Sequence, residues 1–151
     1  MHINPDHFLE TDTGRITTHE RNKVAWEKCF HALDLALLDA NSETKVYVMV
    51  GPQGAGKSTW VRNHVETRPD TIVFDAILVK RSERKPIIDA AKALGVQVVA
   101  VWLQTPLDVC ISRNSKRPTD ELVSERAIRN VHAAIEAPRL EEGFTEILIV
   151  E

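Results

Sequence analysis

Gly51-Pro52-Gln53-Gly54-Ala55-Gly56-Lys57-Ser58 is the stretch of this sequence that decides the fold. It matches the phosphate-binding pattern Gly-x-x-x-x-Gly-Lys-Ser/Thr. The apolar run at residues 46–50 just before it is typical of a buried parallel strand, and residues 59–66 after it are compatible with a helix. A strand, a glycine loop and a helix in this order gather backbone N–H groups and the positive end of a helix dipole around a phosphate. The sequence therefore predicts a nucleotide site here.

The residues expected to bind ATP are those of the loop and the first residues after it: Gly51, Gln53, Gly54, Ala55, Gly56, Lys57, Ser58 and Thr59. Lys57 would reach the β- and γ-phosphates, and the hydroxyl of Ser58 would ligate Mg²⁺. The alternative is a glycine-rich turn that only happens to carry a lysine.

Composition indicates one ordinary globular domain, residues 1–151, with 43% hydrophobic and 27% charged residues. The net charge of −3 means that the surface as a whole does not attract nucleic acid, so any such binding needs a local basic patch.

Cys29 and Cys110 fall on apolar helix faces without metal-ligand spacing, and we expect both to be reduced core residues. No signal peptide is evident, and the longest apolar run, residues 98–103, is too short to cross a bilayer. These features favour a cytoplasmic protein without a membrane partner; they do not predict an oligomeric state.

Strand and helix patterns alternate along the chain. We expect strands at residues 2–4, 46–50, 71–75, 96–103 and 146–150, and helices at residues 18–41, 59–66, 82–95, 105–117 and 119–135, with a loop at residues 6–17. Because each strand is nearly all apolar, the sheet should be mostly parallel and covered by helices on both faces. The prediction is an α/β fold of the three-layer P-loop NTPase or kinase kind, with a five-stranded sheet. Residues 1–44 would supply a strand and a long helix, and residues 45–151 the P-loop core with a lid near residues 113–118.

Ligands of such sheets bind at the carboxyl ends of the strands, and this rule selects Asp75. An aspartate after the strand that follows the P-loop helix is a candidate to hold Mg²⁺, directly or through water. The alternative is an acid that merely caps the following turn.

Two basic clusters are candidate phosphate contacts. The first, Arg113, Lys116 and Arg117, could close over ATP as a lid and neutralise the charge of the γ-phosphate, or could be solvated charge at a helix end. The second contains Arg81, Arg84 and Lys85; we name Arg81 as a candidate contact to a substrate phosphate, against the alternative of helix-surface charge.

Three segments resemble P-loop polynucleotide kinases. Residues 71–84 carry a strand, Asp75 and Arg84. Residues 105–117 carry Arg-Asn-x-x-Arg, and residues 137–144 carry Pro-x-x-x-Glu-Gly-Phe. The resemblance covers residues 45–150. It implies transfer of the γ-phosphate of ATP to a 5′-hydroxyl of nucleic acid. It also implies that Lys57 and Ser58 hold ATP and Mg²⁺, that Asp75 is the acid near the metal, and that Arg117, with Arg113 beside it, is the lid arginine.

The sequence departs from this family at the general base. The family places an Asn-x-Asp motif on a strand between the P-loop helix and the strand of Asp75, and that unit is missing here. Asn4-Pro5-Asp6 and the long helix after it supply both pieces at the start of the chain. We therefore expect a rearranged strand order with Asp6 as the general base, and Arg21 as a contact to an acceptor phosphate. The alternative is a loose N-terminal arm in which Asn-Pro-Asp is a turn.

The resulting hypothesis is an ATP- and Mg²⁺-dependent kinase that phosphorylates a 5′-hydroxyl end of a polynucleotide. A small metabolite or nucleoside as acceptor is a close alternative, since the sequence shows no aromatic and basic stripe for stacking bases. A nucleotide-binding ATPase module without kinase activity is the alternative of a different class.

Overall fold

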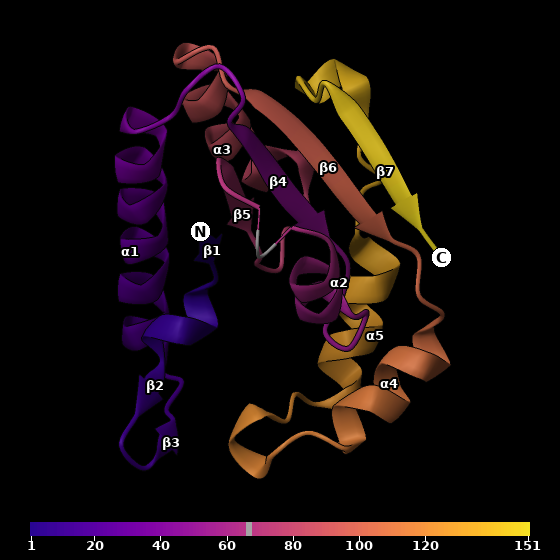
Figure 1. The fold of residues 1–151 in the computed structure, drawn as a ribbon. Helices are drawn as coiled ribbons and strands as arrows, with labels where there is room; N and C mark the ends of the chain where they lie inside the picture. The colour runs from indigo at the N-terminus through magenta and orange to yellow at the C-terminus, as the bar shows by residue number, and fades with distance from the viewer. Residues whose placement is uncertain (66–67) are drawn as a thin grey trace.

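The computed structural model describes residues 1–65 and 68–151, and it is built around a five-stranded sheet (Figure 1). The strand order is β1-β5-β4-β6-β7, and every neighbouring pair is parallel. The strands are β1 (His2–Ile3), β4 (Lys45–Val50), β5 (Thr71–Phe74), β6 (Gln97–Leu103) and β7 (Glu146–Val150). This confirms the expected α/β P-loop fold.

Helices cover both faces of the sheet, which gives three layers. Val46, Val48 and Val50 of β4 pack with α1 (His19–Leu38) and α3 (Arg81–Ala93). Tyr47 and Met49, the residues between them, pack with α2 (Lys57–His64), α4 (Leu107–Ser115) and α5 (Glu125–Ala134) on the other face. Successive side chains of a strand point to opposite faces, so an all-apolar strand feeds two separate cores. Cys29 and Cys110 are fully buried, one in each core, as expected.

The first residues of the chain form the edge strand of this sheet. In β1, Ile3 lies opposite Phe74 of β5, and the N–H of Asp75 donates to the carbonyl of Ile3 at 2.8 Å. Asn4 and Asp75 therefore leave the sheet side by side. The prediction that the chain opens with a short strand of the sheet is confirmed.

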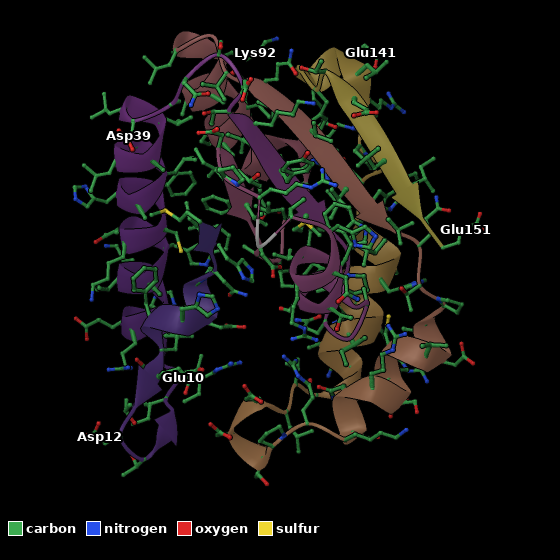
Figure 2. The ribbon with its side chains drawn as sticks, in the orientation of Figure 1. Glu10, Asp12, Asp39, Lys92, Glu141 and Glu151 are labelled. Carbon is green, nitrogen blue, oxygen red and sulfur yellow. The ribbon has the colours of Figure 1, made fainter. Side chains whose placement is uncertain are left out.

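Residues 6–17 are not the loop that the sequence led us to expect. A 3₁₀ turn, η1 (Pro5–Phe8), is followed by a small hairpin, β2 (Glu10–Thr11) and β3 (Gly14–Arg15), which lies beside the N-terminal end of α1. Glu10 and Asp12 mark this hairpin in Figure 2. Strands of two residues are too short for a periodic signal, which is why local pattern missed them.

The helix expected at residues 119–135 is wrong in its first part. Thr119 opens only a 3₁₀ turn, η2 (Thr119–Glu121), and Ser124 caps the shorter α5. The buried side chain of Asn114 donates to the carbonyl of Val123 at 2.6 Å and accepts from its N–H at 3.1 Å. These two bonds hold Val123 out of a helix, because they take the groups that a helix would use.

Several other helices begin one or two residues away from the expected position. α3 begins at Arg81, one residue before the expected start; Glu83 accepts from the N–H of Lys80. α4 begins at Leu107, because the hydroxyl of Thr105 donates to the carbonyl of Ala55 and does not cap the helix. α2 starts at Lys57, earlier than expected, and the expected helix end at Glu66 lies outside the described residues. The last 3₁₀ turn is η3 (Leu140–Glu142).

None of the described helices combines the length and apolar character needed to cross a membrane.

Candidate active site

A cleft of about 710 Å³ opens at the carboxyl ends of β1, β5 and β4. Its walls come from the N-terminal segment, the P-loop and the lid. The N-terminal wall includes Asn4, Asp6, Leu9, Arg15, Thr17, Asn22 and Trp26. The P-loop wall includes Gln53, Gly54, Gly56, Lys57, Ser58 and Thr59, and Asp75 lies between these two walls. The lid wall includes Arg113, Arg117, Asp120, Glu121, Leu122 and Val123.

The P-loop curls as its sequence predicted, and Lys57 closes it. The ammonium of Lys57 donates to the carbonyls of Gly51 and Pro52 at 2.9 and 3.0 Å. Burial lowers the pKa of Lys57; the carboxylate of Asp75 opposes this shift and the guanidinium of Arg117 adds to it. A buried cation gains most from a ligand that brings negative charge, so the position of Lys57 suits a polyphosphate.

Gly54 is required where the loop meets α4. It has φ +79°, and a Cβ on it would collide with the carbonyl of Cys110. This close approach ties the P-loop to the helix that carries the lid arginine, Arg113.

Ser58 and Asp75, the two predicted magnesium ligands, lie together. The hydroxyl of Ser58 donates to Oδ2 of Asp75 at 3.4 Å, and the side chain of Asp75 is almost fully buried. Hydroxyl and carboxylate oxygens are ligands that Mg²⁺ prefers, and it keeps other positions for phosphate and water, so these residues fit the ion. Within residues 1–65 and 68–151, no group of three or more His, Cys, Asp or Glu side chains is arranged to hold a metal by itself.

The N-terminal strand reaches the same carboxylate. Nε2 of His2 lies 2.9 Å from Oδ2 of Asp75, and the amide of Asn4 donates to that oxygen at 3.4 Å. The contact of β1 with β5 thus gives Asp75 two polar partners from the N-terminal segment, in addition to Ser58 of α2.

The lid side carries the two predicted arginines. Nη1 of Arg113 donates to the carbonyls of Gly54 and Ala55 at 3.3 and 3.2 Å, so its guanidinium already rests on the P-loop. Arg117 follows the C-terminal end of α4 and lines the cleft. Both arginines and Lys57 line the cleft.

Asp6 faces the P-loop from the N-terminal wall. Its N–H donates to the side-chain carbonyl of Asn4 at 2.9 Å, which fixes the turn, and its carboxylate lies 3.4 Å from Nη1 of Arg15. The side chain of Asp6 is 45% exposed, so it can reach a substrate. Its charge also acts on the pKa of Lys57 across the cleft.

Two predicted substrate contacts lie elsewhere. The guanidinium of Arg21 donates to the carbonyls of Ile16 and Leu9 and braces the hairpin. Arg81 donates to the carbonyl of Ala137 from the first turn of α3. Its neighbour Arg84 is buried and forms two hydrogen bonds with the carboxylate of Glu142. Neither Arg21 nor Arg81 is among the residues that line the cleft.

Sequence reasoning missed His2, Arg15 and the role of Trp26. His2 could have been found, since it shares one face of a strand with Asn4. Arg15 gave no signal, because its partners Glu10, Asp6 and Glu121 are recognisable only in the folded chain. Trp26 of α1 packs on the core and also lines the cleft.

The comparisons with known proteins agree with this geometry. The model of a family described as an AAA domain matches residues 67–138, just under half of the chain. No curated protein matches the chain. The matched stretch includes Asp75, α3 and the lid arginines, while the P-loop precedes it. The fold, the P-loop and this match together show a P-loop nucleotide-binding domain of kinase-like type.

Proposed function

Starting from a P-loop, kinase-like nucleotide-binding domain, we propose that this protein is an ATP-dependent phosphotransferase that moves the γ-phosphate of ATP to a hydroxyl acceptor. One observation carries the proposal: the carboxylate of Asp6 stands on the N-terminal wall of the cleft, opposite the P-loop and the lid arginines. A domain that only binds or hydrolyses nucleotide does not need an acid on that side.

In the proposed reaction the acceptor oxygen attacks the γ-phosphorus of ATP. A bond forms between that oxygen and phosphorus, the bond from phosphorus to the bridging oxygen breaks, and ADP leaves. Asp6 orients the acceptor hydroxyl and takes its proton, which later passes to water. Catalysis then consists of positioning and of stabilising charge, as in other phosphoryl transfers.

Cations on the donor side stabilise the transferring group. Lys57, Arg113 and Arg117 are the residues that would neutralise the phosphate oxygens. Mg²⁺, held by Ser58 and Asp75, would supply further positive charge at the β- and γ-phosphates.

Two acceptor classes fit this chemistry. The resemblance of residues 71–84, 105–117 and 137–144 to polynucleotide kinases supports a 5′-hydroxyl end of nucleic acid. The modest size of the protein, 151 residues, and its net charge of −3 support a small metabolite or nucleoside.

Replacing Asp6 by Asn tests the proposal. We expect Asp6→Asn to lower the rate of acceptor phosphorylation by about 10²–10⁴-fold, since that is the usual contribution of a general base. ATP affinity, measured by calorimetry, should stay close to that of the wild type. The exposed Asp12→Asn, in the hairpin that follows η1 and outside the cleft, is the matched control. Full transfer activity in Asp6→Asn would remove Asp6 from the mechanism.

The alternative is an ATPase module without an acceptor. It predicts ATP hydrolysis at the same rate with and without hydroxyl compounds, and equal rates for Asp6→Asn and the wild type. Acceptor-dependent consumption of ATP, lost in Lys57→Ala, would exclude it.

A further inference from the structure

We propose that the acceptor is a small hydroxyl compound, neutral or cationic, with no phosphate beside the hydroxyl that reacts. This inference rests on the proposed function and chooses between its two acceptor classes. The juxtaposition that carries it is the pairing of Arg15 with three carboxylates where the hairpin meets the lid.

The two sides of the cleft differ in charge. Lys57, Arg113 and Arg117 line the donor side, where ATP would lie. The charged residues lining the other side are Asp6 and Arg15 of the N-terminal wall, joined by Asp120 and Glu121 at the end of the lid wall that contacts Arg15. Among the described residues of that acceptor side, Arg15 is the one cation, so three carboxylates outnumber it.

Arg15 is itself neutralised. Its guanidinium lies 2.7 Å from Glu121 of the lid, 3.0 Å from Glu10 of the hairpin and 3.4 Å from Asp6. Its side chain is 13% exposed, which leaves little of it open to a ligand. A polyanion would have to displace at least one of these carboxylates to reach the guanidinium.

The backbone fixes this arrangement as well. The N–H of Arg15 donates to Oδ2 of Asp120 at 2.7 Å. Gly14 has φ +112°, and a Cβ on it would lie 2.9 Å from the same oxygen. Only glycine lets the hairpin approach Asp120 so closely, so the acids of η2 are held at the cleft.

A polynucleotide acceptor fits this side poorly. Its 5′-terminal nucleotide carries a phosphodiester on the 3′-oxygen of the same sugar that presents the hydroxyl. With that hydroxyl at Asp6, the phosphodiester would face Asp120 and Glu121, and the one cation among the described residues of the acceptor side, Arg15, is already paired. The negative charges of the phosphodiester and of these two carboxylates would repel each other, and the repulsion grows where the cleft excludes water.

The uncharged part of this wall suits a small ring. Thr17 and Asn22 offer hydrogen-bonding groups, and Trp26 offers an aromatic ring. The ring of Trp26 packs against Phe74 with centroids 6.2 Å apart, which fixes its position. A sugar or base can stack on such a ring, and an amine on the acceptor would gain from Asp120 and Glu121.

A matched set of acceptors tests the inference. Radiolabelled ATP is supplied with adenosine, adenosine 3′-monophosphate, 3′-amino-3′-deoxyadenosine and a 5′-hydroxyl oligonucleotide, beside neutral sugars and aminosugars. We expect phosphate beside the reacting hydroxyl to lower kcat/KM by at least about tenfold relative to the matched neutral compound, chiefly through KM. Equal or better use of the phosphate-bearing acceptors would overturn the proposal.

A charge-removing variant gives a second readout that does not need turnover. Asp120→Asn/Glu121→Gln keeps the hydrogen-bond acceptors of η2 and removes two charges. Calorimetry with a 5′-hydroxyl trinucleotide, on protein loaded with a non-hydrolysable ATP analogue, should show binding at least about fivefold tighter for this variant than for the wild type. Glu125→Gln/Glu141→Gln, which removes two exposed charges away from the cleft, should bind like the wild type. Equal trinucleotide binding by the Asp120→Asn/Glu121→Gln variant and the wild type would overturn the proposal.

Failure of this inference differs from failure of the proposed function. If the protein consumes ATP in an acceptor-dependent way but prefers phosphate-bearing acceptors, only the acceptor class is wrong. If no acceptor changes ATP consumption and Asp6→Asn equals the wild type, the phosphotransferase itself is wrong.

Discussion

Lys57 shows how a single residue of this protein serves ligand binding at the expense of stability. Its partly buried ammonium donates to two carbonyls of its own loop. Burial lowers its pKa, so the folded protein holds this proton less tightly than the unfolded chain does.

The sign of the resulting pH dependence can be worked out. Between the lowered pKa of the folded state and the ordinary value of 10.5, the unfolded chain binds more protons, and stability must rise with pH. We expect the free energy of unfolding of the wild type, minus that of Lys57→Met, to increase from pH 8 towards pH 10. Urea titrations at several pH values measure it. A difference that falls with pH would contradict the prediction.

At the scale of elements, the start of α3 is held by a buried ion pair. Arg84 is fully buried, and Nε and Nη2 donate to the two oxygens of Glu142 at 2.9 and 3.1 Å. Nη1 also donates to the carbonyl of Glu136 at 2.9 Å. Arg84 therefore joins α3, η3 and the segment after α5, which explains the arginine without a substrate.

Breaking the ion pair of Arg84 and Glu142 should lower the stability of the folded protein. We expect Arg84→Met to lower the free energy of unfolding by about 3–5 kcal/mol, because the nearly buried carboxylate of Glu142 loses its bidentate partner and keeps only the N–H of Arg139 at 2.8 Å and the guanidinium of Arg81 at 3.8 Å. Thermal and urea unfolding measure the loss. Lys85→Met, which removes the exposed ion pair with Asp89 on the same helix, should change stability by less than about 1 kcal/mol. A loss in Arg84→Met no larger than in this control would show that the pair is not structural.

Helix boundaries illustrate how far local pattern reaches. The apolar spacing of α1 predicted that helix at residues 18–41, within a few residues of its observed ends. The break before α5 depends instead on Asn114, nine positions before its partner Val123. Such a bond competes with helix formation only after α4 has placed the asparagine.

At the scale of the whole molecule, the N-terminal segment belongs to the fold. Cys29, Leu33 and Leu37 of α1 are buried in the same core as β4, β5 and α3. Residues 1–44 also provide the edge strand and one wall of the cleft.

We therefore expect a chain of residues 45–151 alone not to fold cooperatively, because one face of its sheet would be uncovered. Circular dichroism on heating should show no sharp transition, and a dye that binds exposed apolar surface should bind strongly. The full chain is the control. A cooperative transition in the shorter chain would show that its P-loop core is an independent domain.

The sequence by itself determined the parts of this protein that depend on neighbours along the chain. These are the strand, loop and helix around Gly51–Ser58, the all-apolar parallel strands, and the acid at the end of the strand of Asp75. Their signals are local periodicity, glycine positions and motif spacing, which need no knowledge of distant contacts. Only the tertiary structure decided which distant groups meet. It set β1 beside β5, brought His2 to Asp75, surrounded Arg15 with carboxylates, and turned Arg21 and Arg81 away from the cleft. These arrangements depend on pairing between residues far apart in the chain, and that pairing is settled by packing and charge in the folded molecule.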